Sequence, residues 1–388
     1  MLAKSESAAH WAMLRPQAIE AIPVDTARVA EAAFRKGTTV MRLRDVFGTL
    51  FKDEDFTDLF PARGQPALAP WRLALVTIFQ FLENLTDRQA ADAVRGRVDW
   101  KYALGLELED PGFDFSVLSE FRDRLLKDGR EQRLLDKLLE QFKAQGLIKE
   151  RGKQRTDSTF LLANIRVMNR AELVGETLRA ALNEISEVDP EWLRALAPTE
   201  WFERYSHRVE EYRLPKAKAA RDTYLLTVGE DGFVLLDAIN QAASEKLREL
   251  EKVKTLSAVW DRHYERKEER VRWRDKIELT RAAYALESPY DPDARYSTKR
   301  GHEWVGYKVH VTESCDENNP QLIVNVLSTP ATQQDVSTTQ AVHQALADKD
   351  HLPKEQLVDA GYIDAELLVA MKRDFDVQLI GPPRGAKG

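Results

Sequence analysis

The sequence predicts an α/β (α+β) fold, in which a helical N-terminal domain precedes a mixed sheet and a large helical insertion follows the first strand of that sheet. Apolar residues recur at helical spacing through residues 43–126, whereas 153–163 is β-branched and typical of a strand. From residue 303 onward, strand and helix patterns alternate. The predicted parts are a lead-in at 1–42, a helical domain at 43–150, and a sheet domain at 151–388 with its insertion at about 164–287.

The composition is that of a protein that can bury large apolar cores. Of its 388 residues, 43% are apolar and 31% are charged. The sequence has neither a long uncharged apolar run nor a basic segment followed by an apolar one, so we expect a cytoplasmic protein without a membrane partner. Cys315 is the single cysteine, which excludes an internal disulfide and a cysteine metal cage. The net charge of -7 argues against a strongly basic coat protein, so local basic clusters matter more.

Three helix patterns are the clearest part of the helical domain. Pro70–Leu82 is strongly apolar, and Thr86 followed by Gln89 is a capping box that begins the next helix. In the third helix, Arg122 and Arg124 lie on the outward face. Such arginines suit docking on a DNA phosphate backbone, but the interleaved acidic residues are equally typical of a solvated helix face.

The predicted strand at Lys153–Ala163 carries a carboxylate, Asp157, near its middle. Strand interiors disfavour Asp, so this side chain needs either hydrogen-bonding neighbours or a cation. Because side chains alternate along a strand, Asp157 shares a face with Arg155 and Thr159. A structural cap or turn is the simpler interpretation of a lone Asp, and a cation ligand on a rigid strand is the functional one.

A second carboxylate, Asp359, ends a short predicted strand near the end of the sequence. A hairpin at 303–327 and a helix at 335–349 lie before it, and a further helix and strand follow. A first strand with a central Asp, a hairpin, a helix and a strand ending in Asp is the layout of a ribonuclease-H-like mixed sheet. In that layout, neighbouring parallel strands bring Asp157 and Asp359 to one edge of the sheet.

Two carboxylates in such a position repel each other unless a cation neutralises them. Oxygen ligands suit Mg²⁺, with Mn²⁺ as a substitute. Two such ions would activate the attacking oxygen and stabilise the leaving oxygen in a displacement at phosphorus. Asp157 and Asp359 are therefore the predicted metal-binding and catalytic residues.

A basic, turn-rich loop at 290–301 leads into the predicted hairpin. Four residues of the loop and the hairpin are predicted to contact DNA phosphates: Lys299, Arg300, Lys308 and His310. The alternative is that they are solvated hairpin residues. No partners at zinc-binding spacing accompany the histidines. Trp304 fits either a core position or a platform on which a base stacks.

Several stretches are similar to those of a known family: Thr156–Thr159, Glu172–Leu182, Ser288–Gly301, Trp304–His310 and Leu357–Tyr362. They resemble bacterial insertion-sequence transposases of the IS1182 type, within the broad IS4/IS5-like DDE group, from about Leu43 to the last residue. The resemblance implies an enzyme that recognises terminal inverted repeats of double-stranded DNA, acts as a homo-oligomer on DNA, and cleaves and transfers strands with two Mg²⁺ ions. It matches Asp157 and Asp359 to the first and second catalytic carboxylates.

The third carboxylate of that family has no counterpart in this sequence. The family implies a Glu on a helix beyond the last strand, whereas the available acids lie before that strand: Asp364, Glu366, Asp374 and Asp376. We therefore expect a truncated transposase with weakened metal binding and little cleavage by itself. Two alternatives stay open: a non-catalytic DNA-binding fragment that regulates an intact transposase, and a ribonuclease-H-like nuclease that only cuts.

Overall fold

The computed structural model describes residues 12–383 except 242–244, 269, 280–284 and 300. Its contacts divide the chain into two compact units. The helical unit comprises the residues up to Gly152 together with Ser314–Val324, and the sheet unit comprises Lys153–Glu313 and the residues from Asn325 onward. None of the helices in the described part of the chain combines the length and the apolar character needed to cross a bilayer.

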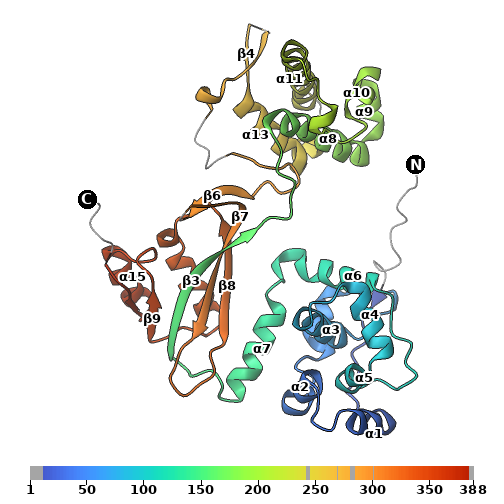
Figure 1. Cartoon of the computed structure of the whole chain (residues 1–388), viewed down its shortest axis with the longest axis vertical. Coiled ribbons are helices and arrows are strands. Elements are labelled where there is room, and N and C mark those ends of the chain that lie inside the picture. Colours follow the sequence, from blue (N-terminus) through green and yellow to red (C-terminus); the bar gives the residue numbers. More distant parts are fainter. Residues whose placement is uncertain (1–11, 242–244, 269, 280–284, 300, 384–388) are drawn as a thin grey trace. The chain divides into compact units, whose positions relative to one another are not determined.

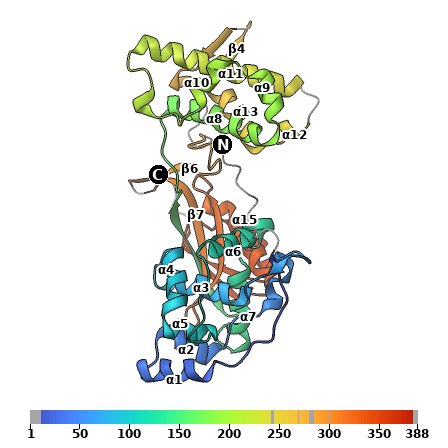
Figure 2. The ribbon, with the colours of Figure 1, turned by 90° about the vertical axis from the view of Figure 1, so that its right-hand side faces the viewer.

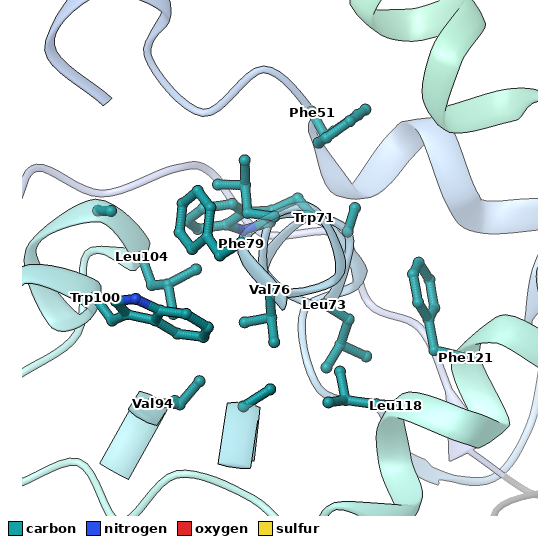
Figure 3. Close-up of a cluster of buried hydrophobic side chains, with 14 of the residues drawn as sticks. Phe51, Trp71, Leu73, Val76, Phe79, Val94, Trp100, Leu104, Leu118 and Phe121 are labelled. Atoms are coloured by element: carbon teal, nitrogen blue, oxygen red, sulfur yellow. The ribbon is translucent and has the colours of Figure 1, made fainter. Parts of the chain in front are cut away.

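Helix α3 forms the centre of the helical unit, because its apolar side chains are buried on several sides. Trp71 and Phe79 of α3 pack with Trp100 and Phe121 in the core shown in Figure 3. The Phe79 and Trp100 rings meet edge to face at 5.3 Å. The helices of this unit are α1 (Val24–Ala33), α2 (Thr39–Phe47), α3 (Pro70–Leu82), α4 (Asp87–Gly96), α5 (Val98–Leu104), α6 (Ser116–Leu126) and α7 (Arg133–Ala144). Shorter elements are β1 (Ala12–Met13), β2 (Gln65–Pro66), η2 (Asp53–Leu59) and η3 (Lys127–Gly129).

The beginning of the helical unit differs from the predicted lead-in. Helix α1 packs on α5, and Thr26 donates a hydrogen bond of 2.8 Å to the carbonyl of Leu106. Helix α2 ends at Phe47 because Gly48 adopts a φ of 68°, so the helical pattern predicted to continue toward residue 60 becomes a 3₁₀ segment. The capping box of Thr86 and Gln89 at the start of α4 is confirmed.

The sheet unit contains the predicted mixed sheet, with β3 in its middle. The strand order is β10-β9-β3-β7-β6, and β8 also pairs with β7 (Figure 1). Strands β10, β9 and β3 are parallel, whereas β6 and β7 are antiparallel. The strands are β3 (Lys153–Leu162), β6 (Arg295–Lys299), β7 (His302–Ser314), β8 (Ile323–Pro330), β9 (Glu355–Val358) and β10 (Gln378–Ile380). The segment η7 (Asp335–Ser337) and the helices α14 (Thr339–Asp348) and α15 (Ala365–Phe375) accompany them.

The helical insertion leaves the sheet after β3 and returns before β6, as predicted. Figure 2 shows its helices gathered together, and α8 packs most closely against α13. Trp260 and Tyr264 are fully buried in its core. The helices are α8 (Arg170–Val188), α9 (Pro190–Leu196), α10 (Thr199–Tyr205), α11 (Lys218–Gln241), α12 (Glu245–Arg248) and α13 (Glu251–His263), with η4 (Glu211–Arg213) and η5 (Lys276–Glu278).

Two segments form strands that the sequence did not predict. The charged stretch after α13 was expected to be helical, but β4 (Tyr264–Lys267) and β5 (Arg270–Trp273) pair antiparallel there. This hairpin buries Tyr264 and brings its ring to 5.0 Å from that of Trp273, a gain that outweighs the helical pattern. The basic loop before residue 301 also contains a strand, β6, which pairs with β7.

Gly232 of α11 lets the helix approach the ring of Trp260. A Cβ at this position would lie 2.2 Å from two ring atoms of Trp260, so Gly232→Ala requires the packed core to shift. We expect the substitution to destabilise the insertion by about 1–3 kcal/mol. Hydrogen exchange of the α11 and α13 amides measures the effect locally.

The matched control is Gly96→Ala at the end of α4, where a Cβ would meet nothing within 4 Å. That change is expected to leave stability unchanged or to raise it by up to about 1 kcal/mol. Equal exchange rates in wild type and Gly232→Ala would contradict the packing described for α11.

Candidate active site at the edge of the sheet

The parallel register of β3 and β9 brings two distant carboxylates together. Arg155 pairs with Leu357, and Thr156 pairs with Val358. The next position in this register is Asp157, inside β3, opposite Asp359, which directly follows β9. Both residues are exposed. The structure therefore brings the two sequence-predicted acids to one edge of the sheet.

A buried hydrogen-bond network beneath the acids fixes this register. Thr156 is 4% exposed, and its Oγ1 lies 2.8 Å from Oγ1 of Thr312 on β7. Gln356 of β9 donates its Nε2 to the same Thr156 oxygen at 2.6 Å. One hydroxyl thus connects three adjacent strands immediately before Asp157. Because the network is buried, each bond in it is costly to lose.

Each carboxylate is oriented by a backbone N–H. Oδ1 of Asp157 accepts from the amide of Ser158 at 2.7 Å, and Oδ1 of Asp359 accepts from the amide of Gly361 at 2.8 Å. Among the described residues, no Lys or Arg forms an ion pair with either acid. In this respect they differ from Glu313, which pairs with Arg155 on the same face of the sheet.

Asp335 is a third carboxylate near this edge, and the sequence analysis missed it. A Cβ at Gly361 would lie 2.9 Å from Oδ1 of Asp359 and 3.2 Å from Oδ2 of Asp335, so both acids flank that glycine. Unlike Asp359, Asp335 has a cationic partner, because Nζ of Lys308 lies 3.0 Å from its Oδ1. No sequence signal distinguished Asp335, which begins the 3₁₀ segment η7 before α14.

The pKa of the Tyr362 hydroxyl is affected by the charges of the three acids. Burial raises the pKa of its hydroxyl well above the usual range, and the charges of Asp335, Asp157 and Asp359 raise it further, although a hydrogen bond with Ser158 acts in the opposite direction. Tyr362 is therefore within electrostatic range of all three acids.

The fit of this edge to a divalent cation is partial. Two exposed carboxylates supply hard oxygen donors, but no group of three or more His, Cys, Asp or Glu is arranged to hold a metal ion in the described part of the chain. The later acids do not complete the set. Asp364 caps α15 by accepting from Leu367, while Asp374 and Asp376 pair with their neighbours Arg373 and Lys372. Glu366 lies in the first turn of α15.

The basic residues of the loop and hairpin that were predicted to contact DNA lie in different environments. Lys299 is exposed, and Lys308 is held by Asp335 and by the carbonyl of Gln333. Arg300 lies outside the described residues. His310 differs from the prediction: it is fully buried, with Nδ1 bonded to the Tyr362 hydroxyl and Nε2 to Thr329. Burial lowers its pKa, so His310 is a neutral core residue with no ring nitrogen left for a phosphate.

The two arginines predicted to bind DNA make contacts within the helical unit. Arg122 forms an ion pair of 2.6 Å with Asp87. Arg124 donates to the carbonyl of Leu59 at 3.0 Å, and its guanidinium lies over the ring of Phe60. Both side chains are only half exposed, so they stabilise the packing of α6 whether or not they also approach DNA.

Removing the Thr156 hydroxyl tests the network under the acids. Thr156→Val keeps the shape but leaves Gln356 and Thr312 without a buried partner, and we expect a loss of about 1–3 kcal/mol in the free energy of unfolding. Chemical denaturation measures it. Thr159→Val, on the exposed part of the same strand, is the control and is expected to change stability by less than about 0.5 kcal/mol. Equal effects of the two changes would argue against the network.

Comparison with known proteins adds one match to these observations. No curated protein and no solved structure matches the chain. Residues 28–124 match the family model described as Transposase domain (DUF772). The matched segment runs from α1 into α6 and therefore covers most of the helical unit. This match supports placing the chain with the transposases.

Proposed function

We propose that this protein is an insertion-sequence transposase that binds the terminal inverted repeats of its element and cleaves and transfers DNA strands. The observation that carries the proposal is the pairing of β3 with β9, which sets Asp157 beside Asp359. Both acids are exposed, and no Lys or Arg of the described residues pairs with either, so their carboxylates are available to a cation. The transposase-domain match over residues 28–124 supports DNA as the substrate.

In this proposal, Asp157 and Asp359 hold Mg²⁺, with Mn²⁺ as a substitute. When bound, two such ions supply an activated attacking oxygen and stabilisation of the leaving oxygen at phosphorus. The protein itself positions the acids and the DNA strand. Ser158 and Gly361 orient one oxygen of each acid through their amides, which leaves the other oxygen for a ligand. Lys299 contacts the DNA backbone and holds the strand near the acids without reading its sequence.

The state of Asp335 favours a second candidate function. Its ion pair with Lys308 ties up the nearest additional carboxylate, so the cation is held by two acids and binds weakly. A protein with such a site can bind DNA ends while cutting them poorly. Regulation of an intact transposase by this chain is therefore the alternative to full catalysis. Transfer of a labelled DNA end into an acceptor plasmid separates these functions from simple hydrolysis.

Cation binding is the first quantity to measure. We expect the wild-type chain to bind Mn²⁺ weakly, and Asp157→Asn or Asp359→Asn to lower the affinity at least tenfold, because each removes one of two charged ligands. Isothermal titration or the relaxation of water protons by Mn²⁺ provides the readout. DNA binding in a gel shift is expected to survive both substitutions.

Asp374→Asn is the matched control, since this acid is on the surface and pairs with Arg373. It is expected to leave Mn²⁺ affinity unchanged. If Asp157→Asn and Asp374→Asn bind Mn²⁺ equally well, the proposed site is wrong. Efficient nicking of element ends by the wild-type chain would instead contradict weak cation binding and favour full catalysis.

A further inference from the structure

A cavity of about 230 Å³ adjoins the acidic edge of the sheet. Residues of β3 and of the β6–β7 hairpin line it: Ser158, Thr159, Phe160, Lys299, His302, Trp304 and Lys308. The hydroxyl of Ser158 lies 3.5 Å from Oδ2 of Asp335, so the cavity adjoins the acidic edge through this contact. Pockets for drug-sized ligands usually span about 300–1,000 Å³, which makes this cavity suitable for one smaller flat group.

One wall of the cavity is aromatic, and its outer ring is Phe160. The Phe160 side chain is 52% exposed, whereas Trp304 is 5% exposed. Their ring centroids are 5.6 Å apart with the planes at 36°, so Trp304 supports Phe160 from below. Trp304 also donates its Nε1 to the carbonyl of Tyr307, which fixes the indole. The ring that can stack with a ligand is therefore Phe160, and the buried Trp304 ring packs against it and supports it.

The other wall is basic. Lys299 and His302 face each other across the β6–β7 register and are both exposed. Lys308 is fixed by its ion pair with Asp335 and forms the inner part of this wall. No carboxylate is present among the described residues that line the cavity. An aromatic ring beside an exposed lysine and an imidazole suits a ligand that has both a flat base and a phosphate.

We propose that this cavity holds one unpaired nucleotide of a DNA strand, with its base against Phe160 and its phosphate against Lys299 and His302. The inference rests on the proposed function and deepens it. A base inside a duplex is covered by its neighbours, so only an unstacked nucleotide can place its face on the ring. Thr159 follows Asp157 by two strand positions, about 7 Å. The phosphodiester next to the bound nucleotide can therefore reach Asp157.

The test uses the full chain and a duplex of arbitrary sequence that ends in one unpaired 2-aminopurine. Stacking on Phe160 is expected to quench the fluorescence of this base when the protein binds. Phe160→Leu keeps an apolar side chain but removes the ring, and it is expected to abolish the quenching and to weaken binding of the overhang duplex roughly fivefold or more. Phe160→Tyr is expected to restore both. Unchanged thermal melting of these variants excludes unfolding as the cause.

Controls separate this inference from its alternatives. Phe202→Leu, at a ring on α10 that is 63% exposed against 52% for Phe160, is expected to behave as wild type. Lys299→Gln is expected to weaken the binding of the overhang duplex and to reduce its dependence on salt. Equal quenching by wild type and Phe160→Leu would overturn the proposal. Competition by a free mononucleotide as strong as that by the overhang duplex would also overturn it, since the pocket would then serve a soluble nucleotide.

The proposed function and this pocket can fail separately. Asp157→Asn is expected to lose cation binding while retaining the quenching, because its side chain does not line the cavity. If quenching is absent while Asp157 and Asp359 bind Mn²⁺ as expected, only the pocket assignment is wrong. If quenching is present while neither acid affects Mn²⁺ affinity, the site at the sheet edge is wrong.

Discussion

The hydroxyl of Thr156 is the contact on which the candidate site depends. It lies within hydrogen-bond distance of Thr312 on one neighbouring strand and Gln356 on the other, in the last buried layer before the acids. A shift of one residue in a strand moves every side chain to the opposite face. Polar groups buried between β7, β3 and β9 penalise such a shift, because any other register leaves them unpaired. The position of Asp157 beside Asp359 follows from this constraint.

The insertion is tied to the strands by a short series of polar contacts. Glu176 of α8 is buried and accepts from the hydroxyl of Tyr290 at 2.6 Å, and Arg179 pairs with the same carboxylate. Burial opposes ionisation of Glu176, but its hydrogen bonds to Arg179, Tyr290 and a backbone amide lower the pKa overall. Asp291, the residue after Tyr290, accepts a hydrogen bond from the hydroxyl of Tyr307 on β7. The ion pair of Glu176 and Arg179 in the insertion therefore fixes Tyr290, which lies in the segment that leads into β6.

The acidic edge and the neighbouring cavity are chemically different. Asp157 and Asp359 present exposed carboxylates, whereas Lys299 presents an ammonium and His302 an imidazole beside an aromatic ring. Lys308 stands between the two environments, because its amine neutralises Asp335 while its side chain lines the cavity. The proposed function uses both environments: basic residues would contact the phosphates of a DNA strand, and the acids would hold the ions that act on one of them. The transposase-domain match lies in the helical unit, so it supports the substrate and not the residues of this site.

The sequence by itself determined the local features. The apolar face of α3, the capping box at Thr86, the interrupted order of strands and the positions of Asp157 and Asp359 all follow from periodicity and spacing along the chain. Only the tertiary structure decided which side chains are buried and which partners they meet. It made His310 a neutral core residue, turned the charged stretch after α13 into a hairpin, and placed Asp335 beside Gly361. These outcomes depend on contacts between residues far apart in the chain. Such contacts cannot be predicted from the pattern of neighbouring residues.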